Sequence, residues 1–206
     1  MTKIFLSKEL GHVNAPSITI FDFETTSKEP AIAEIITGYF RTVDAQTKAL
    51  IDEMKVKMRP LKWNMKAQEI HGITEEEART YPEKRVMMRE IFRYLTKHKD
   101  SVFICHANYT TFGIRGYFDW QVLKTECLYL DVLHHFKELF NDITIYSTHT
   151  MAKDRKLPLR RFGLGDIAEY YGIEFKHHDC KEDVIATEKI FWELVETRDL
   201  LTIMEE

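Results

Sequence analysis

The chain has 206 residues, of which 44% are hydrophobic and 30% charged, and its formal net charge is −4 at pH 7. This composition excludes a disordered tail, a collagen-like fibre and a coiled-coil rod. The small negative charge excludes a strongly basic protein that coats nucleic acid without regard to sequence. We expect a short N-terminal leader at residues 1–16 and one domain at residues 17–206.

The cysteines and the hydropathy pattern indicate a compartment. Cys105, Cys127 and Cys180 are far apart and odd in number, which predicts free thiols rather than a disulfide framework. No apolar run approaches the ~20 residues that a membrane span needs, and the N-terminal segment lacks the apolar centre of a signal peptide. We therefore expect a cytoplasmic protein with no membrane partner.

Strands are predicted early in the chain, and helices alternate with strands later. β-branched and aromatic residues predict strands at 17–21, 32–43, 49–58, 101–105 and 126–130. Apolar residues at helical spacing predict helices at 83–98, 112–123, 132–140, 163–171 and 181–198. A meander followed by alternating helices and strands indicates an α/β fold with a mixed sheet.

Two carboxylates follow the first predicted strand. Asp22 and Glu24 are two residues apart, so in a strand their side chains face the same side. They repel each other there unless a cation lies between them, and hard oxygen ligands suit Mg²⁺ or Mn²⁺. The alternative is an ordinary solvated strand end, which a single Asp-x-Glu pattern does not exclude.

A second cluster precedes the last predicted helix. Asp183 falls in the first turn, where a carboxylate is electrostatically favoured, and His178 lies five residues earlier. His178 could act as general base on a water held near Asp183. A zinc site made of His177, His178 and Cys180 is disfavoured because residues so close in sequence do not easily form a tetrahedron.

Three separated motifs carry a family resemblance. They are Asp22-x-Glu24-Thr-Thr, Ile70-His-Gly-Ile-Thr74 and His178-x-Cys-x-x-Asp183-x-x-Ala-Thr187. From about residue 17 to about residue 197, the chain resembles the DEDDh (DnaQ-like) 3′→5′ exonucleases of the proofreading type. The resemblance implies a ribonuclease-H-like fold, in which helices flank a central mixed five-stranded sheet.

The resemblance also implies two-metal hydrolysis of phosphodiester bonds, releasing nucleoside monophosphates. Asp22 would contact both Mg²⁺ or Mn²⁺ ions, Glu24 and Asp183 would hold the first ion, and His178 would deprotonate the attacking water. The backbone of Thr25 would hold the terminal 3′-hydroxyl group. The residues expected to contact substrate are Thr25, Thr26, His71, Asn108 and Thr111.

One departure from the family pattern concerns its second aspartate, which begins the helix after the fourth strand. No carboxylate occurs between Asp100 and Asp119. Thr111 is the best match to this position, whereas Asp119 would lie two helical turns, about 12 Å, further along. His106 or Asn108 could coordinate or orient a water instead. We therefore expect the second metal ion to be weakly held.

The leading hypothesis is a metal-dependent 3′→5′ exonuclease that acts on single-stranded or frayed nucleic-acid ends. DNA is expected ahead of RNA, although oligoribonucleases of the same superfamily perform this chemistry on RNA. The alternative is a weakened or inactive relative that binds nucleic-acid ends or a protein partner. Association with a polymerase is compatible with the sequence, but no feature of the sequence indicates it.

Overall fold

The computed structural model describes residues 2–7, 11–111 and 114–205, with side chains described for 14–107 and 116–196. A mixed five-stranded sheet forms its centre, with the order β5-β4-β3-β6-β9. β3 pairs antiparallel with β4, β4 pairs antiparallel with β5, and β3, β6 and β9 run parallel. The strands are β3 (Ser17–Thr25), β4 (Ile35–Asp44), β5 (Leu50–Lys57), β6 (Val102–Cys105) and β9 (Thr144–Ser147). The predicted mixed sheet is confirmed.

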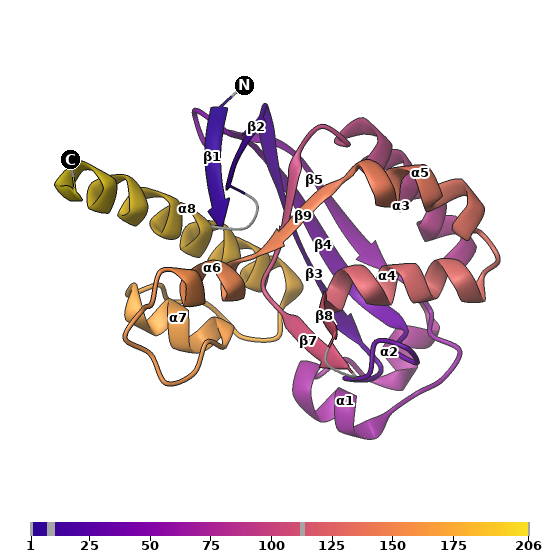
Figure 1. The fold of residues 1–206 in the computed structure, drawn as a ribbon. Helices are drawn as coiled ribbons and strands as arrows, with labels where there is room; N and C mark the ends of the chain where they lie inside the picture. Colours follow the sequence, from indigo (N-terminus) through magenta and orange to yellow (C-terminus); the bar gives the residue numbers. More distant parts are fainter. Residues whose placement is uncertain (1, 8–10, 112–113, 206) are drawn as a thin grey trace.

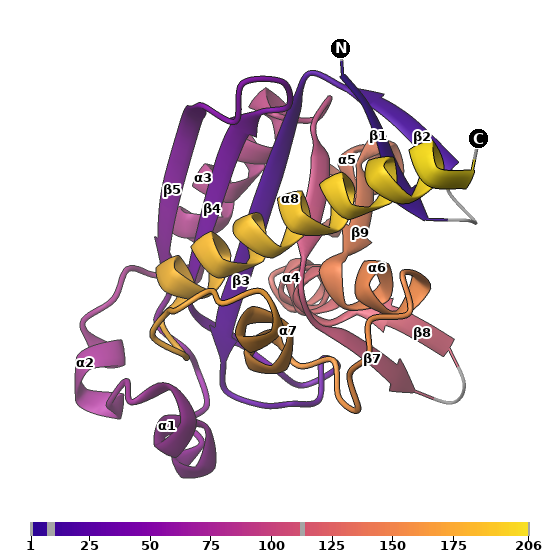
Figure 2. The same ribbon diagram turned by 90° about the vertical axis from the view of Figure 1, so that its left-hand side faces the viewer.

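Helices cover both faces of this sheet (Figure 1). One face carries the long helix α8 (Cys180–Glu205), which crosses β3 and β4, together with α6 (Thr148–Asp154) and α7 (Leu164–Tyr170). The other face carries α3 (Lys84–Lys97), α4 (Phe118–Tyr129) and α5 (Leu133–Asp142). Two short helices, α1 (Met65–His71) and α2 (Glu75–Arg79), lie beyond one end of the sheet, as Figure 2 shows.

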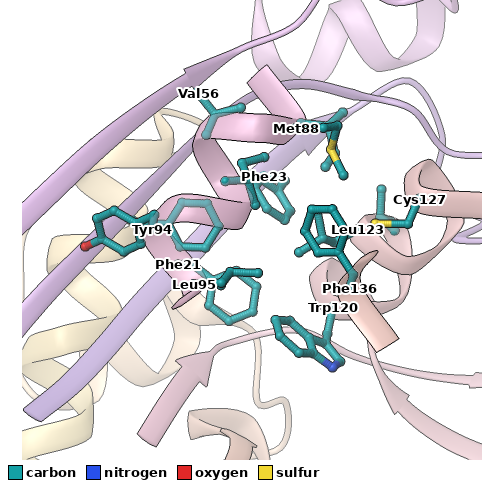
Figure 3. Close-up of a cluster of buried hydrophobic side chains, with 14 of the residues drawn as sticks. Phe21, Phe23, Val56, Met88, Tyr94, Leu95, Trp120, Leu123, Cys127 and Phe136 are labelled. Atoms are coloured by element: carbon teal, nitrogen blue, oxygen red, sulfur yellow. The ribbon is translucent and has the colours of Figure 1, made fainter. Parts of the chain in front are cut away.

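Alternation along β3 separates two cores. Ile18 and Ile20 pack on the α8 side, whereas Phe21 and Phe23 belong to the core beneath α3, α4 and α5 (Figure 3). The Phe23 ring lies directly against Gly38 of β4, where it occupies the space that a Cβ atom would need. The same alternation places Asp22 and Glu24, which each follow one of these phenylalanines, on the α8 side.

Two elements differ from their prediction. The strand predicted at 126–130 is wrong, because residues 126–129 continue α4 and the fifth strand is β9. A short apolar run does not distinguish a strand from a buried helical turn, and Glu126 and Cys127 are fully buried on this helix.

The helix predicted at 112–123 is also wrong at residues 114–117, and residues 112 and 113 lie outside the described part of the chain. A hairpin of β7 (Asn108–Thr111) and β8 (Ile114–Tyr117) lies there, and α4 begins only at Phe118. The hairpin returns the chain to its starting point, since the Phe118 amide donates to the Ala107 carbonyl over 3.1 Å. The hairpin therefore delays the start of α4 along the sequence. In space, α4 still begins beside Ala107, just after β6.

The leader predicted at 1–16 contains the hairpin of β1 (Thr2–Ser7) and β2 (Gly11–Ala15), and β1 lies beside α8 (Figure 2). The boundary at residue 17 stays a prediction. Cys105, Cys127 and Cys180 are buried and free, as predicted. No described helix combines the length and apolar character needed to cross a membrane.

A buried ion triad joins the residue before β4, Glu34, to the helices α3 and α4. Lys84 Nζ lies 2.6 Å from carboxylate oxygens of both Glu34 and Glu126. Glu126 also accepts the Ile35 amide, and the backbone of Glu34 bonds to Thr26 in both directions. The triad thus fixes the segment that immediately follows β3.

We expect Lys84→Met to destabilise the protein by about 3–5 kcal/mol near neutral pH, because two buried carboxylates lose their common cation. The loss should shrink in acid, where the Glu126 carboxylate, whose pKa is raised by burial, becomes protonated. Denaturant unfolding at several pH values measures both effects. As a control, Lys97→Met removes a surface ion pair with Asp52 and should cost at most about 1 kcal/mol. Equal losses in the two variants would contradict the role given to the triad.

Candidate active site

The first acidic pair lies at the carboxyl end of β3. Asp22 and Glu24 are opposite Tyr39 and Thr37 of β4, and both side chains face the α8 side of the sheet. Parallel pairing of β3 with β6 is confined to residues 18–20, so Asp22 and Glu24 lie beyond the part of β3 that pairs with β6. The predicted carboxylate pair is therefore present on one face at an open sheet end.

The start of α8 brings the third carboxylate to this pair. The Asp179 side chain accepts the Lys181 amide at 3.1 Å, which satisfies one of the free N–H groups of the helix start. Asp183 follows one turn later and is buried. The backbone N–H of His178 donates to the Asp183 carboxylate, so the loop and the helix are joined at this point.

The fourth carboxylate is Asp119, in the first turn of α4. Its side chain is only 2% exposed, and Oδ1 accepts the Phe23 amide at 3.3 Å. Its other oxygen, Oδ2, is buried and has no hydrogen-bond partner within the described residues. A carboxylate oxygen left this way is costly in a protein interior unless another group, such as a cation, contacts it.

The expectation that Asp119 lies too far away is therefore wrong. It assumed a continuous helix after β6, whereas the β7–β8 hairpin occupies the intervening residues. Thr111 lies on β7 opposite Ile114, at the end of the hairpin away from α4. The β-branched residues Thr110, Thr111 and Ile114 were a sequence signal for strands that the helical interpretation overlooked.

Repulsion and burial together raise the pKa values of all four carboxyl groups in the metal-free protein. Burial is the larger cause for each of them, and the charges of the neighbouring acids add to it. The pKa values of Glu24, Asp119 and Asp183 rise to about 7, and that of Asp22 rises well above its usual range. None of the ion pairs among the described side chains involves any of the four.

This donor set fits a divalent cation. Oxygen atoms of Asp22 and Glu24 and the sulfur of Cys180 all lie within 4.8 Å of one another. Asp119 Oδ2 has no partner, and no described lysine or arginine side chain pairs with the four carboxylates, so their negative charge is not compensated within the described residues. A divalent cation bound by these carboxylates would compensate it.

His178 is held in an unusual backbone conformation beside these acids. Its φ is +62°, a left-handed value that costs about 1–2 kcal/mol for a residue with a side chain. The hydrogen bond from its N–H to Asp183 retains this conformation. Desolvation, followed by the charges of His177 and Lys28, lowers the pKa of His178 and favours the neutral ring.

A cavity of about 670 Å³ gathers most of the predicted site residues. Its lining includes Asp22, Glu24, Thr25, His71, His106, Asp119, His178 and Asp183. Thr26 is buried and accepts the Glu34 amide at 3.0 Å, so its hydroxyl holds the loop. Asn108 and Thr111 lie on β7, and their side chains are outside the described residues.

The two histidines of this cavity differ in what they offer. Both ring nitrogens of His106 have partners, Thr148 Oγ1 at 2.8 Å and the Phe162 carbonyl at 3.2 Å, which leaves neither free to bind a cation. His71 Nδ1 accepts the Ile73 amide at 3.0 Å, so Nε2 carries the proton. That N–H is buried without a hydrogen-bond partner among the described residues.

Comparisons with known proteins identify the family of this chain. The family model RNase_T, described as "Exonuclease", matches residues 19–191. The PolC-type DNA polymerase III of Thermotoga maritima is 28% identical over 184 residues, covering 87% of this chain and 12% of the polymerase. That of Thermotoga petrophila is 27% identical over 196 residues, covering 93% of the chain and 13% of the polymerase. The chain thus spans about an eighth of these relatives.

Solved nucleases share the fold. E. coli exonuclease I in complex with a dT13 oligonucleotide superposes with a TM-score of 0.72 at 18% identity, covering 91% of this chain and 43% of that one. Cell-death related nuclease 4 gives a TM-score of 0.67 at 16% identity, covering 89% and 64%. The sheet and its helices thus have the ribonuclease-H-like fold. The family model matches residues 19–191, which is most of the chain, so the chain belongs to the RNase_T exonuclease family.

We predict that the metal-free protein loses stability as the pH rises from about 4 to about 7. The pKa values of Glu24, Asp119 and Asp183 are raised on folding, so the folded state binds more protons than the unfolded state in this window. Thermal unfolding in the presence of a chelator measures the effect, and adding Mn²⁺ or Mg²⁺ above the window should restore the lost stability.

Asp119→Asn should reduce this pH dependence, because one buried charge is removed. The matched control Asp142→Asn changes an exposed carboxylate far along α5 and should leave the dependence as in the wild type. A wild-type melting temperature that rises steadily across the window would contradict the raised pKa values.

Proposed function

We propose that this protein is a metal-dependent 3′→5′ exonuclease that removes nucleoside monophosphates from single-stranded or frayed DNA. The observation that carries the proposal is the convergence of Asp22, Glu24, Asp119 and Asp183 with no paired cation among the described side chains. Such a site suits the two-metal form of phosphodiester hydrolysis. Mg²⁺ or Mn²⁺ is the cofactor that carboxylate oxygens favour.

The carboxylates have complementary roles in this proposal. Asp22, at the centre of the cluster, and Glu24, Asp119 and Asp183 around it would hold the two cations. When bound, these cations supply an activated water and neutralise charge on the phosphate. Asp119 takes the place that the sequence assigned to Thr111, and its unpartnered Oδ2 supports this choice.

The remaining residues would move the proton and position the strand end. His178 accepts the proton of the attacking water, and its lowered pKa keeps the ring neutral for that step. The backbone of Thr25, which lines the cavity, holds the terminal 3′-hydroxyl group. His71 donates its free Nε2–H to the terminal nucleotide, and the Ile73 amide maintains the required tautomer.

DNA is the substrate that the comparisons favour. The curated relatives are DNA polymerases, and the exonuclease I structure contains a dT13 oligonucleotide. Lys28 and Lys66 line the cavity and provide local cations for a phosphate backbone. Because the chain is acidic as a whole, we propose gripping of a strand end rather than coating of a long strand.

The direct test compares oligonucleotides of DNA and RNA that carry a label at either end. With Mn²⁺, a 5′ label should yield a ladder that shortens from the 3′ end, and a 3′ label should appear at once as a mononucleotide. Absence of metal-dependent release from all four substrates would contradict the proposal and leave a binding protein. Faster release from RNA would contradict the preference for DNA.

Asp119→Asn should lower turnover more than about 100-fold, since even supporting groups around a metal cost 10–100-fold when removed. Thr111→Asp discriminates the two candidate positions. If Asp119 holds the second cation, metal titrations of wild type and Thr111→Asp should superimpose. A lower metal requirement in Thr111→Asp would return that role to residue 111.

His178→Asn should lower turnover by about 10² to 10⁴, the range that a positioned general base supplies. The same change should raise the melting temperature, because asparagine tolerates left-handed backbone better than histidine does. His177→Asn provides the control for a neighbouring histidine. Unchanged turnover in His178→Asn would move the base elsewhere, with His177 the first alternative.

A further inference from the structure

A thiol lies inside the carboxylate cluster and has no role in the proposed reaction. Cys180 is the first residue of α8 and is 8% exposed. Its Sγ lies within 4.8 Å of carboxylate oxygens of both Asp22 and Glu24, and its side chain hydrogen-bonds to Asp22. Neither Mg²⁺ nor Mn²⁺ favours a sulfur ligand. The thiol therefore adds to this site a property that hydrolysis with those ions does not need.

The three donor atoms match the coordination of a softer cation. Thiolate and carboxylate ligands at about 2.3 Å and about 2.1 Å from tetrahedral Zn²⁺ lie about 3.6 Å apart. The present separations are up to 4.8 Å, so binding requires the donor atoms to move closer by about 1 Å. Two carboxylates and one sulfur leave the fourth position for water, as in open zinc sites.

A second cavity gives such a cation a separate route. It has a volume of about 630 Å³ and contains Cys180 in its lining, whereas the substrate cavity does not. The residues that line both cavities are Glu24, Ile70, His71, His177 and His178. The sulfur thus borders a cavity other than the one that gathers the four carboxylates.

A purely structural role for the thiol makes a different prediction. Cys180 Sγ lies 3.4 Å from Thr37 Oγ1, and a serine hydroxyl at residue 180 could make the same contact. If the sulfur only packs and hydrogen-bonds, serine replaces it without consequence for metal binding. If the sulfur is a ligand, serine abolishes the preference for soft cations.

We propose that Cys180, Asp22 and Glu24 form a binding site for a thiophilic divalent cation, such as Zn²⁺ or Cd²⁺, that competes with the catalytic ions. The sulfur binds as thiolate, and its proton leaves to solvent. Binding itself does not depend on the protein being a nuclease, whereas the competition rests on the proposed function. Soft cations at this site arrest hydrolysis by displacing the ion that Asp22 and Glu24 would hold.

Cd²⁺ titration of the full chain tests binding without reference to activity. Thiolate coordination to Cd²⁺ gives an ultraviolet charge-transfer band, and we expect a band that saturates at one ion per chain in the wild type. Cys180→Ser should lose the band, and the matched control Cys127→Ala, which removes a buried thiol of α4, should keep it. A second variant, Asp22→Asn, retains the thiol and should weaken Cd²⁺ binding at least about tenfold.

The band identifies the sulfur involved. A wild type without the band, or a Cys180→Ser variant that keeps it, overturns the proposal, and in the latter case Cys105 or Cys127 supplies the sulfur. Asp22→Asn keeps the assay decisive should Cys180→Ser fail to fold, because unchanged Cd²⁺ affinity in that variant also overturns the proposal.

Zn²⁺ inhibition of Mn²⁺-supported hydrolysis tests the competition, with each variant compared to its own uninhibited rate. Wild type and Cys127→Ala should be inhibited at Zn²⁺ concentrations at least about tenfold lower than Cys180→Ser. Equal inhibition of all three overturns the competition. A Cys180-dependent band in a protein that releases no nucleotide supports the cation site and contradicts only the proposed function.

Discussion

The repulsion among four buried carboxyl groups is the constraint on which the rest of this structure depends. Burial and mutual repulsion disfavour ionisation of all four carboxylates. The backbone N–H groups of Phe23 and His178 oppose this effect, and no described lysine or arginine pairs with the four carboxylates. A lysine or arginine fixed beside the carboxylates would compete with an incoming metal ion. Since no such ion pair holds the acids together, their positions depend on the packing of the two hydrophobic cores and on the Lys84 triad.

Local sequence predicted the elements that have a clear pattern of their own. β3 is rich in β-branched and aromatic residues and is buried on both faces, and α3 presents one buried stripe, so both were placed to within a few residues. β9 escaped prediction because it is short and its burial does not alternate: its first two residues are half-buried and its last two buried. The end of α4 was taken for a strand because buried residues surround that helix. The sequence of a short segment does not show which other elements will cover it, and this decides whether it forms a strand or a helical turn.

The site was predictable where its residues are joined by spacing along a single element. Asp22 and Glu24 share a strand face, and His178 and Asp183 share a loop and helix start, so their sequence separation fixes their proximity. Asp119 reaches the cluster only through a tertiary contact with the Phe23 amide. Its separation from β6 along the chain carries no information on distance once a hairpin intervenes. The left-handed backbone at His178 was likewise beyond sequence reasoning, because histidine does not require it.

The β7–β8 hairpin leaves and rejoins the domain at adjacent points. Asn108 pairs with Tyr117, and the Phe118 amide bonds to the Ala107 carbonyl, so the two ends form a closed neck. Length added beyond that neck changes neither the first turn of α4 nor the position of Asp119. The neck is thus a natural graft point, where another hairpin or a small binding module can be exchanged while the acidic centre keeps its geometry. Diversity in what the domain recognises can accumulate there independently of its chemistry.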